Sequence, residues 1–180
     1  MSEKKQKILG ICGSLRKDSY NLKVLRVMGK DFGEEIDFAI ADLADIPPFN
    51  EDVEALGDPE AVKIFKDAIR AADALIIATP EYNYGLPGVL KNALDWASRP
   101  FSDSALSGKR IAILGASQGM GGTIRAQLQL RQTLHGNRAD VLPEPEVFIA
   151  TVQNKFDEQG ELTDERTKNV LKKLGEKVKK

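Results

Sequence analysis

The chain has 180 residues, of which 42% are hydrophobic and 29% charged, and its formal net charge at pH 7 is −1. This composition is typical of one globular domain, spanning residues 1–180, and the near-zero charge gives no electrostatic reason to expect nucleic acid or an anionic membrane as a partner. A single cysteine, Cys12, excludes an internal disulfide, and with His135 as the one histidine it leaves no cysteine–histidine cluster for zinc, so we expect no metal.

The N-terminal segment MSEKKQK lacks the apolar stretch of a secretory signal, and no apolar run approaches the roughly 20 residues that a membrane helix needs. We therefore expect a cytoplasmic protein.

Strand-like and helix-like patterns alternate along the chain. In chain order they predict a strand at 7–12, a helix at 21–30, a strand at 36–40, a helix at 58–72, a strand at 74–79, a helix at 87–98, a strand at 110–116, a helix at 122–134 and a proline-interrupted strand at 141–149. Thr163 and Asp164 are expected to cap a final helix. The alternation predicts an α/β fold, a doubly wound five-stranded parallel sheet with helices on both faces. Such sheets bind ligands beyond the carboxyl ends of their strands.

The loop after the first strand reads GSLRKDSYN and leads into a helix start, where main-chain N–H groups and the helix dipole favour an anion. Ser14, Ser19 and Asn21 can donate neutral hydrogen bonds, and Arg16 adds a charged planar fork. The loop lacks the GKS or GKT ending of a P-loop and also lacks GxGxxG, which disfavours a nucleoside triphosphate and a tightly bound dinucleotide. A monophosphate is the expected ligand, although helix capping alone would explain Ser19 or Asn21.

The loop after the third strand combines carboxylate, phenol and amide groups, a mixture that suits a planar heterocycle. Its residues are Pro80, Glu81, Tyr82, Asn83, Tyr84 and Gly85. Turn chemistry alone would also explain Asn83 and Gly85.

The loop after the fourth strand, ASQGMGG, has three glycines within four positions, which lets the main chain approach a ring closely. Because all three loops belong to the same edge of the predicted sheet, we expect them to converge on one ligand.

The segments GSLRKDSYN, PEYNYGLPGVLKNALDW and GASQGMGGTIRAQLQLRQTL resemble the NADPH-dependent FMN reductase family of flavodoxin-like quinone, chromate and azo-dye reductases, over roughly residues 8–152. The resemblance implies non-covalent FMN as cofactor and NAD(P)H as co-substrate. It also implies contacts of the phosphate with Ser14, Arg16, Ser19 and Asn21, of the isoalloxazine ring with Pro80, Glu81, Tyr82, Asn83, Tyr84 and Gly85, and of the other side of the ring with Ser117 and Gly119. In similar chains a serine often stands where this chain has Gly85, so only a main-chain contact is expected there.

By the same resemblance, the expected activity is reduction of quinones, chromate, azo compounds or flavins by ping-pong hydride transfer through flavin N5. No side chain is expected to act as a catalytic acid. Glu81 and Tyr82 are candidates for shaping the acceptor pocket, while a structural Glu81 tied into a subunit contact is an equal alternative. Main-chain N–H groups of Asn83 to Gly85 are expected to stabilise the anionic reduced ring.

Two other classes of function fit the sequence less well. A flavodoxin-type electron carrier without its own NAD(P)H oxidation would share the fold. Such carriers usually benefit from an acidic surface that steers them toward redox partners, and the near-neutral net charge argues against this class. A hydrolase or transferase with Ser14 or Ser117 as nucleophile is disfavoured, because the chain has one histidine and no GxSxG elbow.

The remaining conspicuous residues have structural explanations. Cys12 is expected to be a small packed residue, His135 to lie at a helix end in a capping role, and Trp96 to pack in the core or at a subunit contact.

The helices at 87–96 and 122–134 are expected to help form a homodimer or homotetramer, with Arg99 and Arg125 as candidate interface residues.

Overall fold

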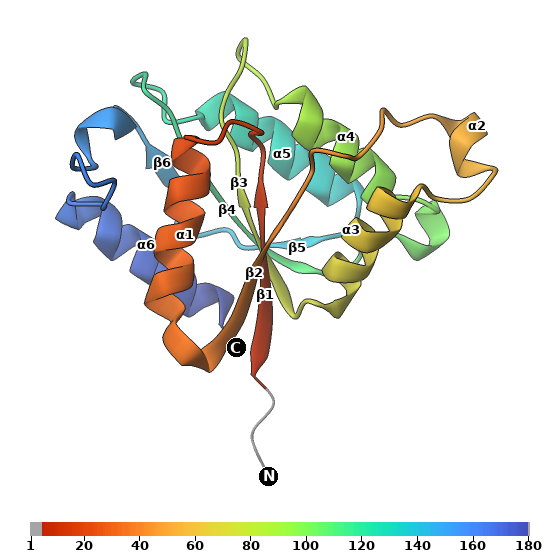
Figure 1. The fold of residues 1–180 in the computed structure, drawn as a ribbon, viewed down its shortest axis with the longest axis horizontal. Helices are drawn as coiled ribbons and strands as arrows, with labels where there is room; N and C mark the ends of the chain where they lie inside the picture. The colour runs from red at the N-terminus through yellow and green to blue at the C-terminus, as the bar shows by residue number, and fades with distance from the viewer. Residues whose placement is uncertain (1–4, 180) are drawn as a thin grey trace.

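The computed structural model describes residues 5–179, in which parallel strands alternate with helices (Figure 1). The strands are β1 (Gln6–Cys12), β2 (Ile36–Ala41), β3 (Ala74–Ala78), β4 (Arg110–Ala116), β5 (Asp140–Val141) and β6 (Val147–Ile149). Their order is β2-β1-β3-β4-β5, β6 also pairs with β4, and every pairing is parallel. This is the strand order of the flavodoxin-like doubly wound fold, as the sequence predicts.

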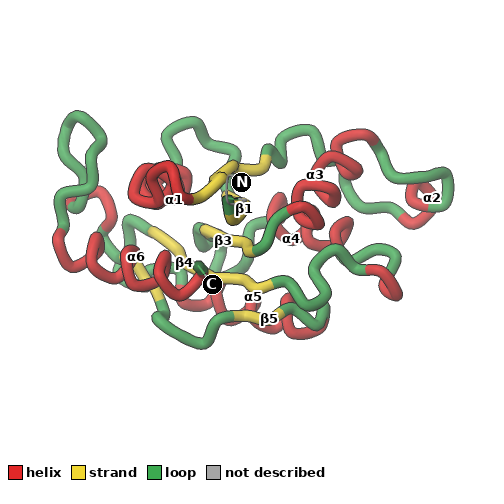
Figure 2. The backbone as a smooth tube through the Cα atoms, turned by 90° about the horizontal axis from the view of Figure 1, so that it is seen from below, coloured by secondary structure: helices red, strands yellow, loops and turns green. Residues whose placement is uncertain are grey.

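The α-helices are α1 (Tyr20–Phe32), α2 (Glu51–Glu54), α3 (Glu60–Ala71), α4 (Gly88–Ala97), α5 (Ile124–Gly136) and α6 (Glu165–Val178). The end-on view shows α1 and α6 on one side of the strands and α3 and α4 on the other (Figure 2). The core contacts place α5 with α3 and α4. Within residues 5–179, no helix has the length and apolar character needed to cross a membrane.

The core lies in two layers, one on each face of the sheet. Successive strand residues point to opposite faces, so Ile76 of β3 packs with α1 and α6, whereas Leu75 and Ile77 pack with α3, α4 and α5. All five residues of β3 are fully buried, as expected for a central parallel strand covered on both faces.

The predicted strand at 141–149 is divided into two. β5 pairs with the start of β4, β6 pairs with its end, and the residues between them include Pro143 and Pro145. Because proline has no N–H to donate, the ladder is interrupted there.

Two other details differ from the sequence-based expectation. The four-residue helix α2, capped by the Asn50 side chain, was not predicted. Helix α5 begins at Ile124 instead of at Gly122, because Gly122 (φ 55°) and Thr123 (φ 70°) are left-handed and cannot continue a right-handed helix.

Cys12 and Trp96 are packed in the core, as predicted. Cys12 is buried, and burial raises the pKa of its thiol. Trp96 is fully buried; its Nε1 donates to the carbonyl of Pro47 at 2.8 Å, and its ring meets that of Phe49 edge-on at 4.9 Å between centroids.

His135 lies in the last turn of α5, but Asn137 is the residue that caps this helix. The chain then reverses at Arg138, whose φ is 58°.

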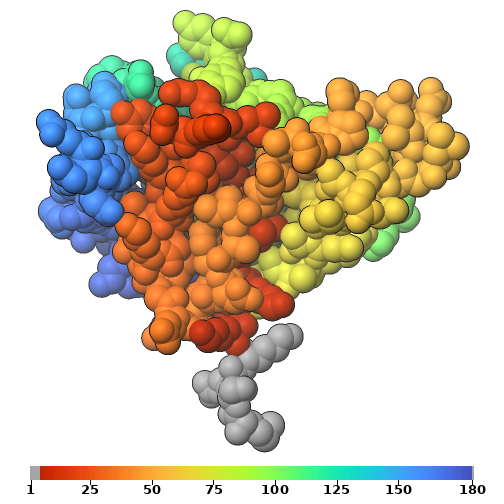
Figure 3. Space-filling model, in the orientation of Figure 1, coloured from red at the N-terminus to blue at the C-terminus, as the bar shows by residue number. Residues whose placement is uncertain are grey.

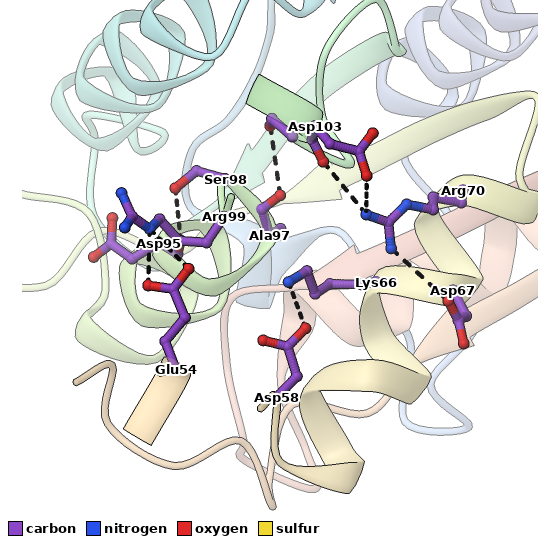
Figure 4. A network of polar contacts seen from close by, with 11 residues as sticks. Glu54, Asp58, Lys66, Asp67, Arg70, Asp95, Ala97, Ser98, Arg99 and Asp103 are labelled. Atoms are coloured by element: carbon purple, nitrogen blue, oxygen red, sulfur yellow. Dashed lines mark hydrogen bonds and ion pairs between the residues drawn. The ribbon is translucent and has the colours of Figure 1, made fainter. Parts of the chain in front are cut away.

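Polar contacts gather around α2, α3 and the chain that follows α4 (Figure 4). Arg99, a predicted interface residue, donates from Nε to both carboxylate oxygens of Glu54 at 3.0 and 3.1 Å. The buried Lys66 pairs with Asp58 in the same corner. Arg99 is therefore engaged within its own chain.

Candidate functional site

The three loops singled out in the sequence leave the sheet side by side at its carboxyl edge, the top edge in Figure 1. They follow β1, β3 and β4, which are adjacent strands, and Cys12, Ala78 and Leu114 lie level with one another in the sheet. Since neighbouring strands are about 4.8 Å apart, the loops begin within reach of a single small ligand. The predicted convergence of the three loops is thus found.

The loop after β1 has the groups needed to bind an anion. Ser14 is buried; its Oγ accepts from the N–H of Arg16 at 3.3 Å and lies 3.4 Å from the hydroxyl of Tyr82. The first turn of α1 contains no acidic residue that would compensate the positive end of its dipole. Arg16 is exposed and makes no ion pair within the described part of the chain.

Ser19 and Asn21 hold the start of α1 in place. Ser19 is the N-cap, with its Oγ accepting from the N–H of Leu22 at 3.4 Å. The buried amide of Asn21 donates to the carbonyl of Ala116 at 3.0 Å and accepts from its N–H at 2.9 Å. Their structural roles are therefore visible, while contact of either residue with a phosphate stays a prediction.

The loop after β3 is a tight hairpin. Tyr82 and Gly85 exchange two main-chain hydrogen bonds of 3.1 and 3.0 Å, and the residues between them, Asn83 (φ 48°) and Tyr84 (φ 64°), are both left-handed. This is the two-residue turn that matches the twist of paired strands. Its tip projects from the top of the molecule (Figure 3). The sequence predicts that the main-chain N–H groups of Asn83, Tyr84 and Gly85 stabilise the reduced ring. The Gly85 N–H donates inside the turn, so the N–H groups of Asn83 and Tyr84 are the two that remain available.

Glu81 caps helix α5. Its carboxylate accepts from the main-chain N–H of Arg125 at 2.9 Å and of Ala126 at 3.3 Å, and from the guanidinium of Arg125 at 3.1 Å. Arg125 also lies over the ring of Tyr84, 4.7 Å from its centroid. Glu81 thus makes these contacts within its own chain, and Arg125, a predicted interface residue, links the hairpin to α5. A part of Glu81 in the acceptor pocket stays a prediction.

The loop after β4 is bound to the segment that follows β6. Ser117 donates its N–H to Ile149 at 2.9 Å and its hydroxyl to Gly119 at 3.1 Å, and Gly119 also accepts from the N–H of Thr151 at 3.1 Å. A Cβ added at Gly119 would meet nothing within 4 Å, so this position faces open space. The neighbouring Met120 is 84% exposed.

Gln129 is a site residue that the sequence analysis missed. Its Oε1 accepts from the N–H of Leu86 at 2.8 Å, and a Cβ added at Gly85 would lie 3.0 Å from the same atom. The glycine therefore leaves room for Gln129 behind the hairpin. A glutamine 44 positions away carries no spacing pattern that could have identified this pairing.

These residues fit FMN. The donor set at the start of α1 suits its phosphate, the exposed Tyr82, Asn83 and Tyr84 can cover a flat ring, and Gly119 leaves room on the opposite side.

The model of one protein family, described as NADPH-dependent FMN reductase, matches residues 6–154. An NAD(P)H-dependent FMN reductase of Pseudomonas aeruginosa is 52% identical over 165 residues, covering 92% of this chain and 89% of the relative. A quinone reductase of Escherichia coli K12 is 43% identical over 170 residues, covering 93% and 89%.

Among solved structures, the flavoenzyme NAD(P)H:(acceptor) oxidoreductase FerB of Paracoccus denitrificans superposes with a TM-score of 0.88. It is 35% identical to this chain, with 96% of this chain and 94% of that one covered. The chain belongs to the NADPH-dependent FMN reductase family, and it is accordingly an oxidoreductase that uses FMN and NAD(P)H.

Proposed function

We propose that this protein is a quinone reductase that binds FMN between the three loops and oxidises NAD(P)H. The observation that carries the proposal is the meeting of the loops after β1, β3 and β4 at one edge, with Ser14 and Tyr82 in contact across two of them. The name of the Escherichia coli relative supports quinones as the acceptor class.

In this proposal the phosphate is bound by Ser14, by Arg16 and by main-chain N–H groups at the start of α1, with Ser19 and Asn21 supporting that turn. The segment from Pro80 to Gly85 lines one side of the ring. Ser117 and Gly119 line the other side.

When bound, FMN supplies a ring that accepts a hydride at N5 and passes electrons to the acceptor. The protein's own part is to position that ring and to stabilise negative charge on it. The main-chain N–H groups of Asn83 and Tyr84, which donate no hydrogen bond within the described residues, are the donors available for this purpose. Glu81 is committed to α5, so we assign no side chain as a proton donor and expect solvent to supply protons.

Chromate, azo compounds and free flavins are further acceptors that we propose for the same site. Tyr84 is 71% exposed and Met120 is 84% exposed, so the loops that border the proposed ring site present an open rim that would admit acceptors of different sizes. Selection among acceptors would then depend mainly on their redox potential.

We also propose a homodimer, or a tetramer built from it, in which α4 and α5 take part. On α5, Ile124 (42% exposed) and Leu128 (61% exposed) are four positions apart and therefore share one apolar face.

The decisive experiment is anaerobic. The purified protein, loaded with FMN, should lose its visible flavin absorption when NADPH alone is added and regain it when a quinone follows. Initial rates with both substrates varied should give parallel double-reciprocal lines, the signature of ping-pong kinetics. A protein that takes up no FMN would overturn the proposal, a loaded protein bleached only by a partner reductase would indicate an electron carrier, and intersecting lines would refute the ping-pong order.

A further inference from the structure

A groove of about 430 Å³ lies beside the loop after β1, between that loop and the end of β2. Three cationic side chains line it: Arg16 and Lys17 from the loop, and Arg26 from α1. Apolar side chains from α1, from β2 and from the chain just after β2 complete the wall, namely Leu22, Ile40 and Leu43.

The charge in this groove is unbalanced. All three cations are exposed, and none of them makes an ion pair with any acidic residue in the described range 5–179. The lining contains one acid, Asp42, whose Oδ1 is already used by the N–H of Ala44 at 2.9 Å. The groove lining thus carries three positive charges and one negative charge, and the carboxylate already accepts a main-chain hydrogen bond. The net positive charge favours binding of an anion.

We propose that this groove binds the adenosine end of the co-substrate, and that Lys17 and Arg26 recognise the 2′-phosphate of NADPH. The inference rests on the proposed function, because it requires the nicotinamide to lie over a flavin held by the three loops. An arginine fork and a lysine ammonium match a phosphate dianion, while Leu22, Ile40 and Leu43 offer apolar cover for a base. NADPH is then preferred over NADH.

The position of the groove relative to the ring site fits an extended dinucleotide. The groove is at the ends of β2 and β1, and the ring loops follow β3 and β4, two strand spacings or about 10 Å further along the sheet edge. The Ser14 hydroxyl contacts Tyr82, which lies on the β3 side of the loop. Ser14 also lines the groove, so the proposed subsite adjoins the FMN phosphate site, while Lys17 and Arg26 lie on the side toward β2. Ser14 and Arg16 border both sites and are not changed in the test.

Calorimetric titration of the FMN-loaded protein provides a readout that does not depend on turnover. Adenosine 2′,5′-bisphosphate should bind at least about tenfold more tightly than 5′-AMP, which lacks the 2′-phosphate. Arg26→Gln should remove most of that difference and Lys17→Gln part of it.

Lys23→Gln is the matched control. Lys23 lies on the same helix and the variant loses the same charge, but the ammonium stacks 5.3 Å from the centroid of the Tyr20 ring and does not line the groove. It should keep the full difference between the two nucleotides.

Asp42→Asn should act in the opposite direction, because removing the one carboxylate strengthens the field at the groove. The ratio of kcat/KM for NADPH to that for NADH should rise in this variant and fall in Arg26→Gln.

Equal affinity of the unmodified protein for the two adenosine nucleotides would overturn the inference. The inference would also fail if Lys23→Gln lost as much of the affinity difference as Arg26→Gln does. In both cases the flavin would still be bound and NADH still oxidised, so the proposed function would stand. A protein that binds no FMN, or that is inert toward both nicotinamides, would refute the proposed function itself.

Discussion

Ser14 is the residue at which two of the three loops touch, and it is buried beside an exposed arginine. If its hydroxyl binds the FMN phosphate, Ser14→Ala should weaken FMN binding about tenfold, since a hydrogen bond to a charged group is lost. Quenching of flavin fluorescence on titration would measure the change. Ser102→Ala, at an exposed serine outside the three loops, should bind FMN as the unmodified protein does; unchanged affinity in Ser14→Ala would remove this residue from the phosphate site.

Glu81 is 14% exposed and accepts two main-chain N–H groups of α5 as well as the Arg125 guanidinium. Glu81→Gln removes the negative charge at the positive end of that helix, so the free energy of unfolding should fall by about 1 kcal/mol. Urea denaturation followed by circular dichroism would measure it.

The control for this change is Glu158→Gln, because Glu158 is exposed and makes no hydrogen bond or ion pair within the described residues. It should leave the unfolding midpoint unchanged. A Glu81→Gln protein as stable as the parent would show that the cap contributes nothing to stability.

The sequence predicted which loops meet at the carboxyl edge of the sheet but could not say where each polar side chain in them points. The amide of Asn21 is directed inward to Ala116, and Glu81 reaches a helix 44 positions further along the chain. Both contacts depend on how α1 and α5 pack against the sheet. Local patterns of capping and turn residues contain no information on such distant partners.

At the scale of elements, α6 begins with a cap whose strength depends on pH. Hydrogen bonds from the Thr167 side chain, from Lys155 and from the Thr167 main-chain N–H lower the pKa of Asp164 to about 2, below its ordinary value of 3.8. A carboxyl group whose pKa is lower in the folded state stabilises that state above its unfolded pKa, and the contribution is lost as the pH falls through the folded value. The stability advantage of the parent over Asp164→Asn should therefore be constant above about pH 5 and decline progressively between about pH 5 and pH 1.

Urea unfolding at a series of pH values would test this. Asp45→Asn, at an exposed carboxylate without a partner in the described residues, is the matched variant and should show no such loss. A difference for Asp164→Asn that is as large at about pH 2 as at pH 7 would contradict the explanation.

Elements with a strong periodic pattern were predicted closely, and the short or interrupted ones were not. The buried run of β3 and the apolar spacing of α1 were visible because burial on both faces, or on one helix face, selects apolar residues at fixed intervals. Helix α2 has four residues and is too short to show a period. The start of α5 depends on Gly122, where an added Cβ would lie 2.9 Å from Phe148 of β6. This steric constraint exists only once β6 has packed in the folded chain, so the sequence alone does not show it.

At the scale of the molecule, the apolar pair on α5 predicts self-association. Size-exclusion chromatography with light scattering at micromolar concentration should give at least twice the 19.8 kDa of one chain. Leu128→Lys should shift the protein toward the monomer, since it places a charge in the proposed contact.

Leu56→Lys is the control, because Leu56 is 91% exposed but follows α2, outside the proposed contact. It should leave the mass unchanged. A monomeric parent protein would reject the assembly, and a Leu128→Lys protein of unchanged mass would exclude this face of α5 from it.

The two hydrogen bonds between Asn21 and Ala116 join the first turn of α1 to the last residue of β4, and they are buried. Widening the gap between the loops that flank them would leave buried polar groups unpaired, which is costly. The spacing between the loops after β1 and β4 is therefore fixed in the folded chain, so the proposed FMN binding would require little reorganisation of the backbone there. Apo and holo forms should superpose closely around Asn21, and the rate of cofactor uptake should be governed by diffusional encounter and not by the opening of a gate.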